Sequence, residues 1–161
     1  MSDRLVTGVC GLGLALLAAV PTGSQAQQKV REPGNIGLGI GGNAFGGGLS
    51  GKYFINESNA IQGIVGLGYY STSLNLSADY LYNFSPFVQQ EELSVGWYAG
   101  FGGALLLGQS TIGASGIVGV DVDVDEVPLD VYFEYRPSLY FQPFDSGLYL
   151  VSFGGGVRYY F

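Results

Sequence analysis

Carboxylates and arginines are the first candidates for chemistry in this sequence. Asp130, Glu134 and Arg136 lie close together in the chain, and a carboxylate pair beside an arginine is a common arrangement for general acid–base catalysis. If this segment is a strand, however, the two carboxylates stand about 13 Å apart at ~3.3 Å per residue, too far to share a proton. We therefore expect these residues to make structural ion pairs and predict no catalytic residues here.

A second candidate is the acidic run Asp121 to Glu126, in which acids at alternate positions resemble the start of a calcium loop. The rest of that motif is missing, because the sixth position is Glu126 where a turn glycine is expected and the twelfth is Tyr132 where a glutamate is expected. We expect a strand end with acids on one face and no metal. A weak divalent site is the alternative.

Other kinds of site find little support. The glycines of residues 37–42 could suggest a phosphate-binding loop, but no helix pattern follows them, so we predict no bound cofactor. The chain has no histidine and a single cysteine, Cys10. An enzyme is therefore not expected. A histidine-free enzyme remains as the weakest alternative, to be tested by loss of lipid-modifying activity in Asp130→Asn.

The N-terminus predicts export. Arg4 precedes the apolar run Leu5–Val20, and small residues around Ala26 end the segment, as in a signal peptide cleaved after residue 26. An uncleaved anchor is less favoured, because several glycines and Pro21 interrupt a run that is short for a bilayer. We expect residues 1–26 to be a signal peptide, 27–33 a short periplasmic segment, and 34–161 a barrel.

Charge excludes one class of partner. The whole chain has a net charge of −7, and removing residues 1–26 leaves it unchanged because Asp3 and Arg4 depart together. A chain this acidic cannot neutralise a row of phosphates, and nucleic acid is therefore not expected to bind.

Alternation of apolar and polar residues is the dominant pattern in the rest of the chain, and no stretch has helical periodicity. Hairpin-sized connections rich in turn residues separate the alternating segments, which makes neighbouring strands antiparallel. The longest connection, residues 85–92, is expected on the periplasmic side. The prediction is an all-β, eight-stranded up-and-down barrel with strands at Asn35–Gly42, Gly47–Ile55, Ala60–Tyr69, Leu74–Phe84, Leu93–Leu105, Ile112–Val124, Leu129–Phe141 and Tyr149–Phe161.

The two faces of these strands predict which side is the interior. One face carries tyrosine, phenylalanine, valine and leucine, and the other carries glycine, serine and charges. Eight strands cannot enclose the large set, so it should face outward, which only a lipid environment favours. We therefore predict a transmembrane barrel with a structural charge cluster in its lumen, made of Lys52, Asp79, Asp121, Asp123, Asp130, Glu134, Arg136 and Arg158.

Aromatic residues should gather where strands meet the two membrane interfaces. The segment Tyr149–Phe161, with outward aromatics up to the terminal phenylalanine, resembles the small eight-stranded outer-membrane barrels of the OmpA/opacity type, and the likeness extends as architecture from about Gly34 to the end. The predicted aromatic girdles contain Tyr69, Tyr80, Tyr82, Trp97, Phe133, Phe141 and Tyr149. The resemblance implies an assembly signal that contains Phe153, Val157, Tyr159 and Phe161.

This resemblance also implies a place and partners. A member of that family is a porin-like, monomeric barrel of the Gram-negative cell outer membrane, inserted by the barrel assembly machinery among outer-membrane lipids. We expect a non-enzymatic structural or interaction role in the cell envelope. The alternative is a binding module, either membrane-embedded or soluble and lipocalin-like, that holds a hydrophobic ligand or surface partner at Phe45, Tyr70 and Phe144.

Overall fold

The computed structural model describes residues 30–69, 73–90, 93–124 and 126–161, which form β-strands joined by turns. Alternating aromatic, β-branched and small residues favour this extended backbone. The strands of these ranges are β1 (Ile36–Asn43), β2 (Gly46–Phe54), β3 (Asn59–Gly68), β4 (Leu74–Asn83), β5 (Val88–Gln89), β6 (Leu93–Leu107), β7 (Thr111–Val124), β8 (Leu129–Tyr135), β9 (Ser138–Gln142), β10 (Asp145–Tyr149) and β11 (Phe153–Tyr160).

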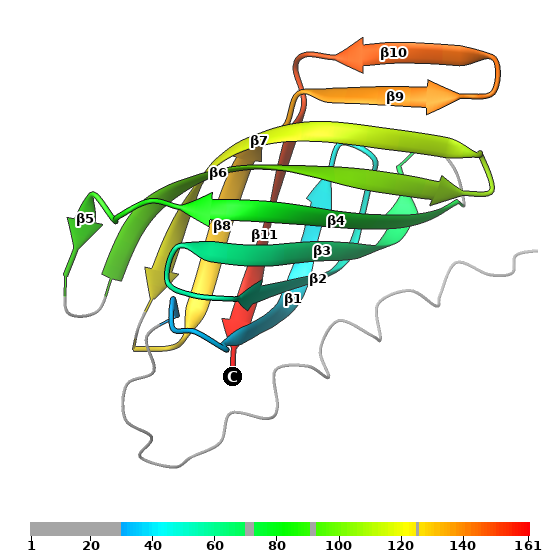
Figure 1. Ribbon diagram of the computed structural model, residues 1–161. Helices are drawn as coiled ribbons and strands as arrows, with labels where there is room; N and C mark the ends of the chain where they lie inside the picture. The colour runs from blue at the N-terminus through cyan, green and yellow to red at the C-terminus, as the bar shows by residue number, and fades with distance from the viewer. Residues whose placement is uncertain (1–29, 70–72, 91–92, 125) are drawn as a thin grey trace, which may run out of the picture.

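Eight of the strands close into an antiparallel barrel (Figure 1). Around the ring, β1, β2, β3, β4, β6, β7, β8 and β11 each pair with the next, and β11 pairs with β1. Following paired residues once around the ring from Leu105 in β6 leads back to β6 at Val95, a shift of ten residues. Such a stagger tilts the strands by about 40° and leaves an interior that side chains fill. The predicted eight-stranded barrel is confirmed.

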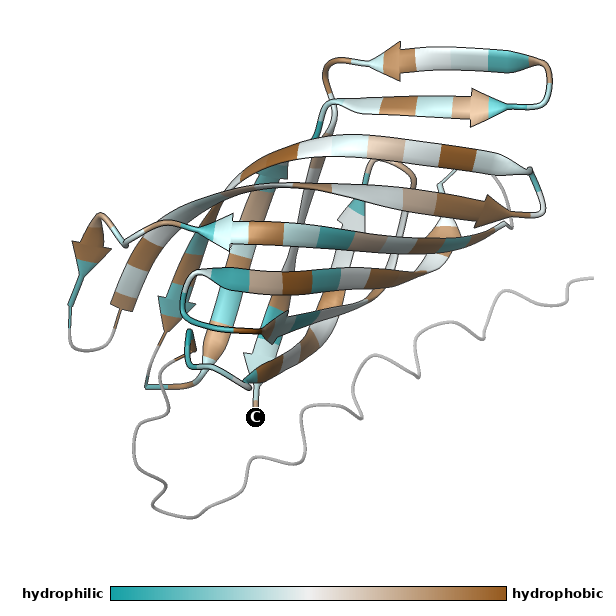
Figure 2. Ribbon diagram, viewed as in Figure 1, coloured by the Kyte–Doolittle hydropathy of each residue, from teal (hydrophilic) through white to brown (hydrophobic). Residues whose placement is uncertain are grey.

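The predicted alternation decides which side chains lie inside. Along β7, buried and exposed residues alternate from Thr111 to Asp121, and β8 alternates in the same way. Brown and pale or teal bands accordingly follow one another along the strands in Figure 2. Charged, polar and small residues face the lumen together with some large apolar side chains such as Phe54, Leu81 and Tyr98, and the exposed aliphatic and aromatic residues form the outer wall.

The last two predicted strands are each interrupted, which corrects the sequence-based boundaries. Residues 129–141 were expected to form one strand, but β8 ends before Arg136 and Pro137, and β9 begins after them. Proline has no N–H to donate to a neighbouring strand, which explains the break. Likewise, residues 149–161 are divided between β10 and β11 at residues 150–152, where the Ser152 carbonyl accepts a hydrogen bond from the Arg136 N–H at 2.7 Å.

The hairpin of β9 and β10 departs from the ring of the barrel. Its strand β9 pairs with the start of β7, between Ile112 and Ser115, whereas β10 pairs only with β9 among the described strands. Strand β1 ends at Asn43, too early to reach β10. In Figure 1 the hairpin therefore extends beyond the barrel as a two-stranded arm.

Some expectations lie outside the described residues. The predicted signal peptide, its cleavage site, and Tyr70, Asp125 and residues 91–92 belong to this part of the chain. In the expected connection 85–92, the described part contains the short strand β5, which pairs with β6. Among the described residues, none belongs to a helix with the length and apolar character that crossing a membrane requires.

Candidate functional site: the filled lumen

The barrel interior holds the charges of the described ring strands. All eight residues of the predicted lumen cluster are buried, with side chains exposed by at most 3 %. They come from β2, β4, β7, β8 and β11, and from the residue after β8, and they occupy inward positions of the alternation. These residues are Lys52, Asp79, Asp121, Asp123, Asp130, Glu134, Arg136 and Arg158.

One part of this network is centred on Arg136. Its guanidinium donates to Asp79 Oδ1 at 2.6 Å and to Glu134 Oε2 at 3.2 Å. Glu134 Oε1 also accepts from Gln62 at 2.9 Å and from the Tyr98 hydroxyl at 2.8 Å. Because three buried donors surround the Glu134 carboxylate, its charge is compensated inside the barrel.

A second part is centred on Arg158. The guanidinium donates to Asp130 Oδ2 at 3.1 Å and to Ser50 Oγ at 2.9 Å, and it also bonds to the side-chain oxygen of Gln62. Gln62 thus connects the two parts. The Arg158 guanidinium also lies 3.7 Å from the ring centre of Tyr132, a cation–π distance.

Glycines make room for this packing. The Tyr132 hydroxyl lies where side chains at Gly41 and Gly156 would be, and the latter's Cβ would stand 2.7 Å from it. Gly41 and Gly156 are paired neighbours on β1 and β11, and Tyr132 pairs with Gly156 from β8. The Tyr132 phenol therefore occupies space that side chains at Gly41 and Gly156 would fill.

Arg31, which the sequence analysis assigned only to a short periplasmic segment, also belongs to the lumen. Its guanidinium bonds to Asp121, to Asp123 Oδ2 at 2.8 Å and to the Phe84 carbonyl at 3.1 Å. Burial lowers the pKa of Arg31, but Asp121 and Asp123 outweigh this effect, so the pKa lies above its ordinary value.

A tight turn brings this segment to the barrel mouth. The Asn35 N–H donates to the Glu32 carbonyl at 3.1 Å, and Gly34 has a φ of 92°. Proline followed by glycine at the centre is typical of a type II turn. The neighbouring Val30 is 1 % exposed and packs in a cluster with Phe54, Ala60, Leu81, Tyr98, Ile117 and Tyr160. The Pro33-Gly34 pair was the sequence signal for this return toward the barrel.

The residues considered for acid–base catalysis, Asp130, Glu134 and Arg136, are divided between the two parts of the network. Asp130 pairs with Arg158, whereas Glu134 pairs with Arg136, and both carboxylates are fully buried. Asp130 is thus committed to the neighbouring strand β11, whereas Glu134 is committed to Arg136 of its own segment and to Gln62 and Tyr98. The geometry is that of structural ion pairs inside a lumen, as the strand spacing predicts.

The acidic run after Val120 does not form a loop. Asp121 and Asp123 lie on inward positions of β7 and meet Asp130 of β8, with one oxygen from each residue within 4.8 Å of the others. Glu126 is exposed. The strands therefore assemble an acidic trio, Asp121, Asp123 and Asp130, that the linear motif did not predict, because Asp130 joins it through register.

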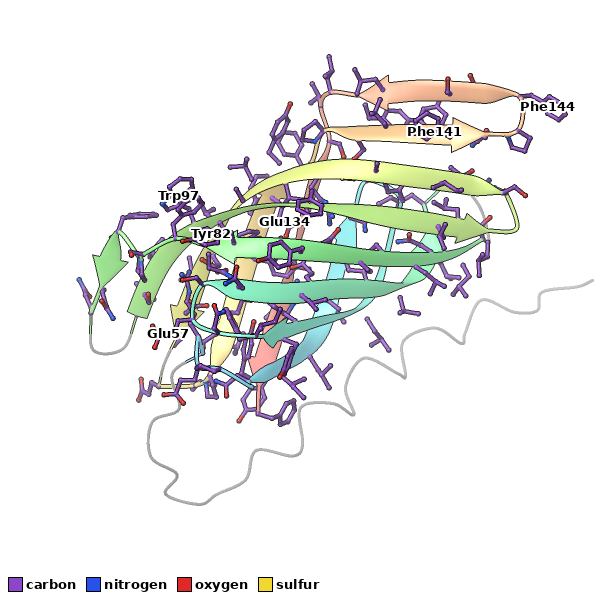
Figure 3. All side chains as sticks on the ribbon, in the orientation of Figure 1. Glu57, Tyr82, Trp97, Glu134, Phe141 and Phe144 are labelled. Atoms are coloured by element: carbon purple, nitrogen blue, oxygen red, sulfur yellow. The ribbon has the colours of Figure 1, made fainter. Side chains whose placement is uncertain are left out.

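Phe45 and Phe144, the two expected outer-rim binding residues that the structure describes, do not form a common surface. Phe45 is 8 % exposed and packs inward with Ala104 and Leu106, which corrects its assignment to the rim. Asn43 Oδ1 accepts from the Phe45 N–H at 2.9 Å and so holds the turn that directs this ring into the lumen. Phe144 lies fully exposed at the tip of the β9–β10 hairpin (Figure 3).

The outer wall carries the residues of the predicted girdles. Trp97 and Tyr82 lie near one end of the barrel in Figure 3, and Phe141 lies on the hairpin toward the other. Trp97 stacks on Phe84 with ring centres 3.8 Å apart. The exposed girdle residues are Tyr69, Tyr80, Tyr82, Trp97, Phe133, Phe141 and Tyr149. The residues of the expected assembly signal also point outward: Phe153, Val157, Tyr159 and Phe161.

Comparison of the chain with protein-family models, curated proteins and solved structures finds no match. The geometry defines the class of the protein as a closed eight-stranded β-barrel with a side-chain-filled lumen.

Proposed function

We propose that this chain is an outer-membrane β-barrel of the OmpA/opacity type, with a structural or interaction role in the cell envelope and no catalytic activity. The supporting observation is the inverted distribution of side chains. The buried set includes five carboxylates, one lysine and two arginines of the predicted cluster, whereas Leu38, Ile40, Leu49, Val65 and Leu67 are each more than half exposed.

Lipid explains this distribution better than water does. A contiguous aliphatic surface of this extent is unfavourable in water and rare on soluble monomers. A soluble lipocalin-like carrier would place apolar side chains inside around a ligand. Here the interior is occupied by Arg136, Arg158 and their partners, and the aliphatic side chains surround it.

The proposal includes export and insertion. The N-terminal 26 residues act as a signal peptide, and the outward side chains from Phe153 to Phe161 are recognised by the barrel assembly machinery. In the membrane the chain is a monomer among outer-membrane lipids. Its lumen blocks open diffusion of solutes, because charged side chains pair across it.

Fractionation and heat modifiability test this proposal. The expressed chain should be recovered in the outer-membrane fraction, begin at residue 27, and migrate as a compact species unless boiled. Recovery from the soluble periplasm, with no shift on boiling, would overturn the membrane assignment and favour a soluble carrier.

A matched pair of variants tests whether the wall faces lipid. Val65 on β3 and Leu148 on β10 are 52 % and 53 % exposed, so arginine at either site meets the surrounding solvent. In lipid vesicles, Val65→Arg should lower the free energy of unfolding by about 2–4 kcal/mol, the cost of an arginine on the lipid face near the midplane. Leu148→Arg, on the arm beyond the ring, should cost far less. Equal, negligible costs would contradict membrane embedding.

A further inference from the structure

The strongest unexplained feature is the way the N-terminal segment occupies the acidic trio. Three carboxylates, Asp121, Asp123 and Asp130, converge inside the barrel within 4.8 Å of one another. Three cationic side chains meet them: Lys52, Arg158 and Arg31. Lys52 and Arg158 belong to the strands of the ring, whereas Arg31 arrives on the short segment that precedes the barrel.

We propose that the acidic trio is a cation site for which Arg31 and a divalent metal ion compete. The strands alone supply three negative and two positive charges, so the site requires one more cation to reach neutrality. Arg31 meets this requirement when the segment is docked. When the segment withdraws, a hard divalent ion such as Ca²⁺, Mg²⁺ or Mn²⁺, which prefers carboxylate oxygens, takes its place.

The wall is shaped for a removable occupant. A Cβ at Gly96 would stand 2.9 Å from the Arg31 Cζ, so the absence of a side chain there leaves the space that the guanidinium fills. Besides Arg31, local contacts join the described part of the segment to the ring: Val30 packs in the apolar cluster, the Gly34 N–H donates to the Phe54 carbonyl at 2.8 Å, and the Asn35 carbonyl accepts from the Phe54 N–H at 3.1 Å. Undocking therefore breaks a limited set of interactions and leaves the ring intact.

The trio also retains coordinating capacity with Arg31 in place. Asp130 is fully buried, and its Oδ2 accepts from both Arg158 and Tyr160, at 3.1 and 3.2 Å. Its other oxygen, Oδ1, has no hydrogen-bond partner among the described residues. A buried carboxylate oxygen with free lone pairs is costly unless a further ligand satisfies it, and a metal ion does so.

Competition at one site makes the two occupants linked. The ion binds the acidic trio only when Arg31 has left. Bound ion therefore lowers the equilibrium constant for docking of the segment by the same factor by which docking lowers the affinity for the ion. Divalent cations would thus loosen the N-terminal segment from the barrel mouth. This linkage depends on the lumen and not on the medium around the wall, so it holds whether or not the membrane proposal is correct.

Binding of Mn²⁺, measured by electron paramagnetic resonance on the purified mature chain in detergent, tests the proposal. Arg31→Gln should bind Mn²⁺ more tightly than the wild type by about tenfold or more, because the competing cation is gone. Arg31→Lys keeps the charge and should remain close to the wild type. Adding Asp123→Asn to Arg31→Gln should abolish the gain. Equal affinities of Arg31→Gln and the wild type would overturn the proposal, as would a gain that persists without Asp123.

Trp97 gives a second measurement that needs no change at Arg31. It is the chain's single tryptophan, and it stacks on Phe84, whose carbonyl accepts from Arg31. Saturating Ca²⁺ should therefore shift Trp97 emission in the wild type and leave it unchanged in Asp123→Asn. Emission that does not change at saturating Ca²⁺, or that changes equally in Asp123→Asn, contradicts competition at this site.

Discussion

The ring of the barrel and the β9–β10 arm are both built of antiparallel strands, yet they bury very different fractions of their residues. In β8, inside the ring, each inward residue from Asp130 to Glu134 is buried. In β9 only Ser138 is buried, and β10 has no buried residue. The difference arises because β10 lacks a neighbour on its second edge among the described strands.

Closure of the ring, rather than alternation itself, therefore creates an interior. Alternation gives each strand two chemically distinct faces, but only a closed wall excludes solvent from one of them. Charged residues are retained where the wall closes and can pair across the lumen, as Arg136 after β8 does with Asp79 of β4. On the arm, Asp145 is exposed, and its carboxylate accepts a hydrogen bond from the Tyr140 hydroxyl at 3.1 Å.

Removing an arginine from the closed region should have the largest effect on stability. Arg158→Met leaves the Asp130 carboxylate buried with only Tyr160 as a donor. We expect the free energy of unfolding to fall by about 3–5 kcal/mol, as when one partner of a buried ion pair is lost. Denaturant titration of the folded barrel, followed by Trp97 emission, measures this loss.

The arm supplies the control for this prediction. Asp145→Asn removes an exposed charge and should change the same free energy by less than about 0.5 kcal/mol. Adding Asp130→Asn to Arg158→Met should recover part of the loss, since it neutralises the uncompensated carboxylate. A cost below about 1 kcal/mol for Arg158→Met would show that water reaches Asp130.

A methyl group added inside the wall should have the next largest effect. The Cβ of Gly48→Ala would lie 2.5 Å from Gly66 Cα on the paired strand, so backbones must move apart. Overpacking of this kind costs about 1–3 kcal/mol. Gly51→Ala, on the outer face of the same strand, meets the Leu38 side chain at 3.6 Å and the Gly37 carbonyl oxygen at 3.8 Å, both ordinary contacts, and should be nearly neutral in the same denaturant titration. Equal effects would mean that the wall tolerates side chains on both faces.

Removal of the β9–β10 arm should lower the free energy of unfolding by less than Arg158→Met or Gly48→Ala does inside the barrel. Replacing residues 138–151 by a short glycine–asparagine turn removes the pairing with Ile112–Ser115 and the 2.8 Å bond between Ser115 and Ser138. The ring keeps all eight strands, so we expect the compact, heat-modifiable species to persist, with a loss of about 1 kcal/mol or less. Failure of this variant to give the compact species would show that the arm is required for closure.

The sequence predicted most of the ring and part of the lumen. Period-two alternation and short connections were sufficient to predict eight antiparallel strands. The face with small and charged residues was identified as the inner one because an eight-stranded barrel has too little interior volume for the large residues of the other face. Pro137 was a visible signal for the break between β8 and β9, but alternation continues across it and hides the break. Strand β10 is left without β1 as a neighbour because β1 ends too early. Where β1 ends relative to β10 depends on the ten-residue stagger of the whole barrel, which cannot be deduced from the pattern of any one segment.

The candidate site shows the same division. Each strand pattern identified its own inward charge, but the grouping of Asp121, Asp123 and Asp130 depends on the register between β7 and β8. Arg31 was not identified because it lies outside the alternating segments. Phe45 was assigned to the rim because its turn position concealed the hydrogen bond from its N–H to Asn43 Oδ1, which directs the phenyl ring inward.

The smallest expected effect is at the tip of the arm, where Phe144 is fully exposed. Phe144→Ser should change the free energy of unfolding by no more than about 0.5 kcal/mol, because the Phe144 side chain is exposed and folding buries none of its surface. Phe153→Ser, at the start of β11, removes a ring stacked on Phe133 at 5.5 Å and should cost more in the same denaturant titration. If Phe144→Ser were the costlier change, the arm would be packed in solution against a surface that the isolated chain does not supply, and closure would not be what separates the two regions.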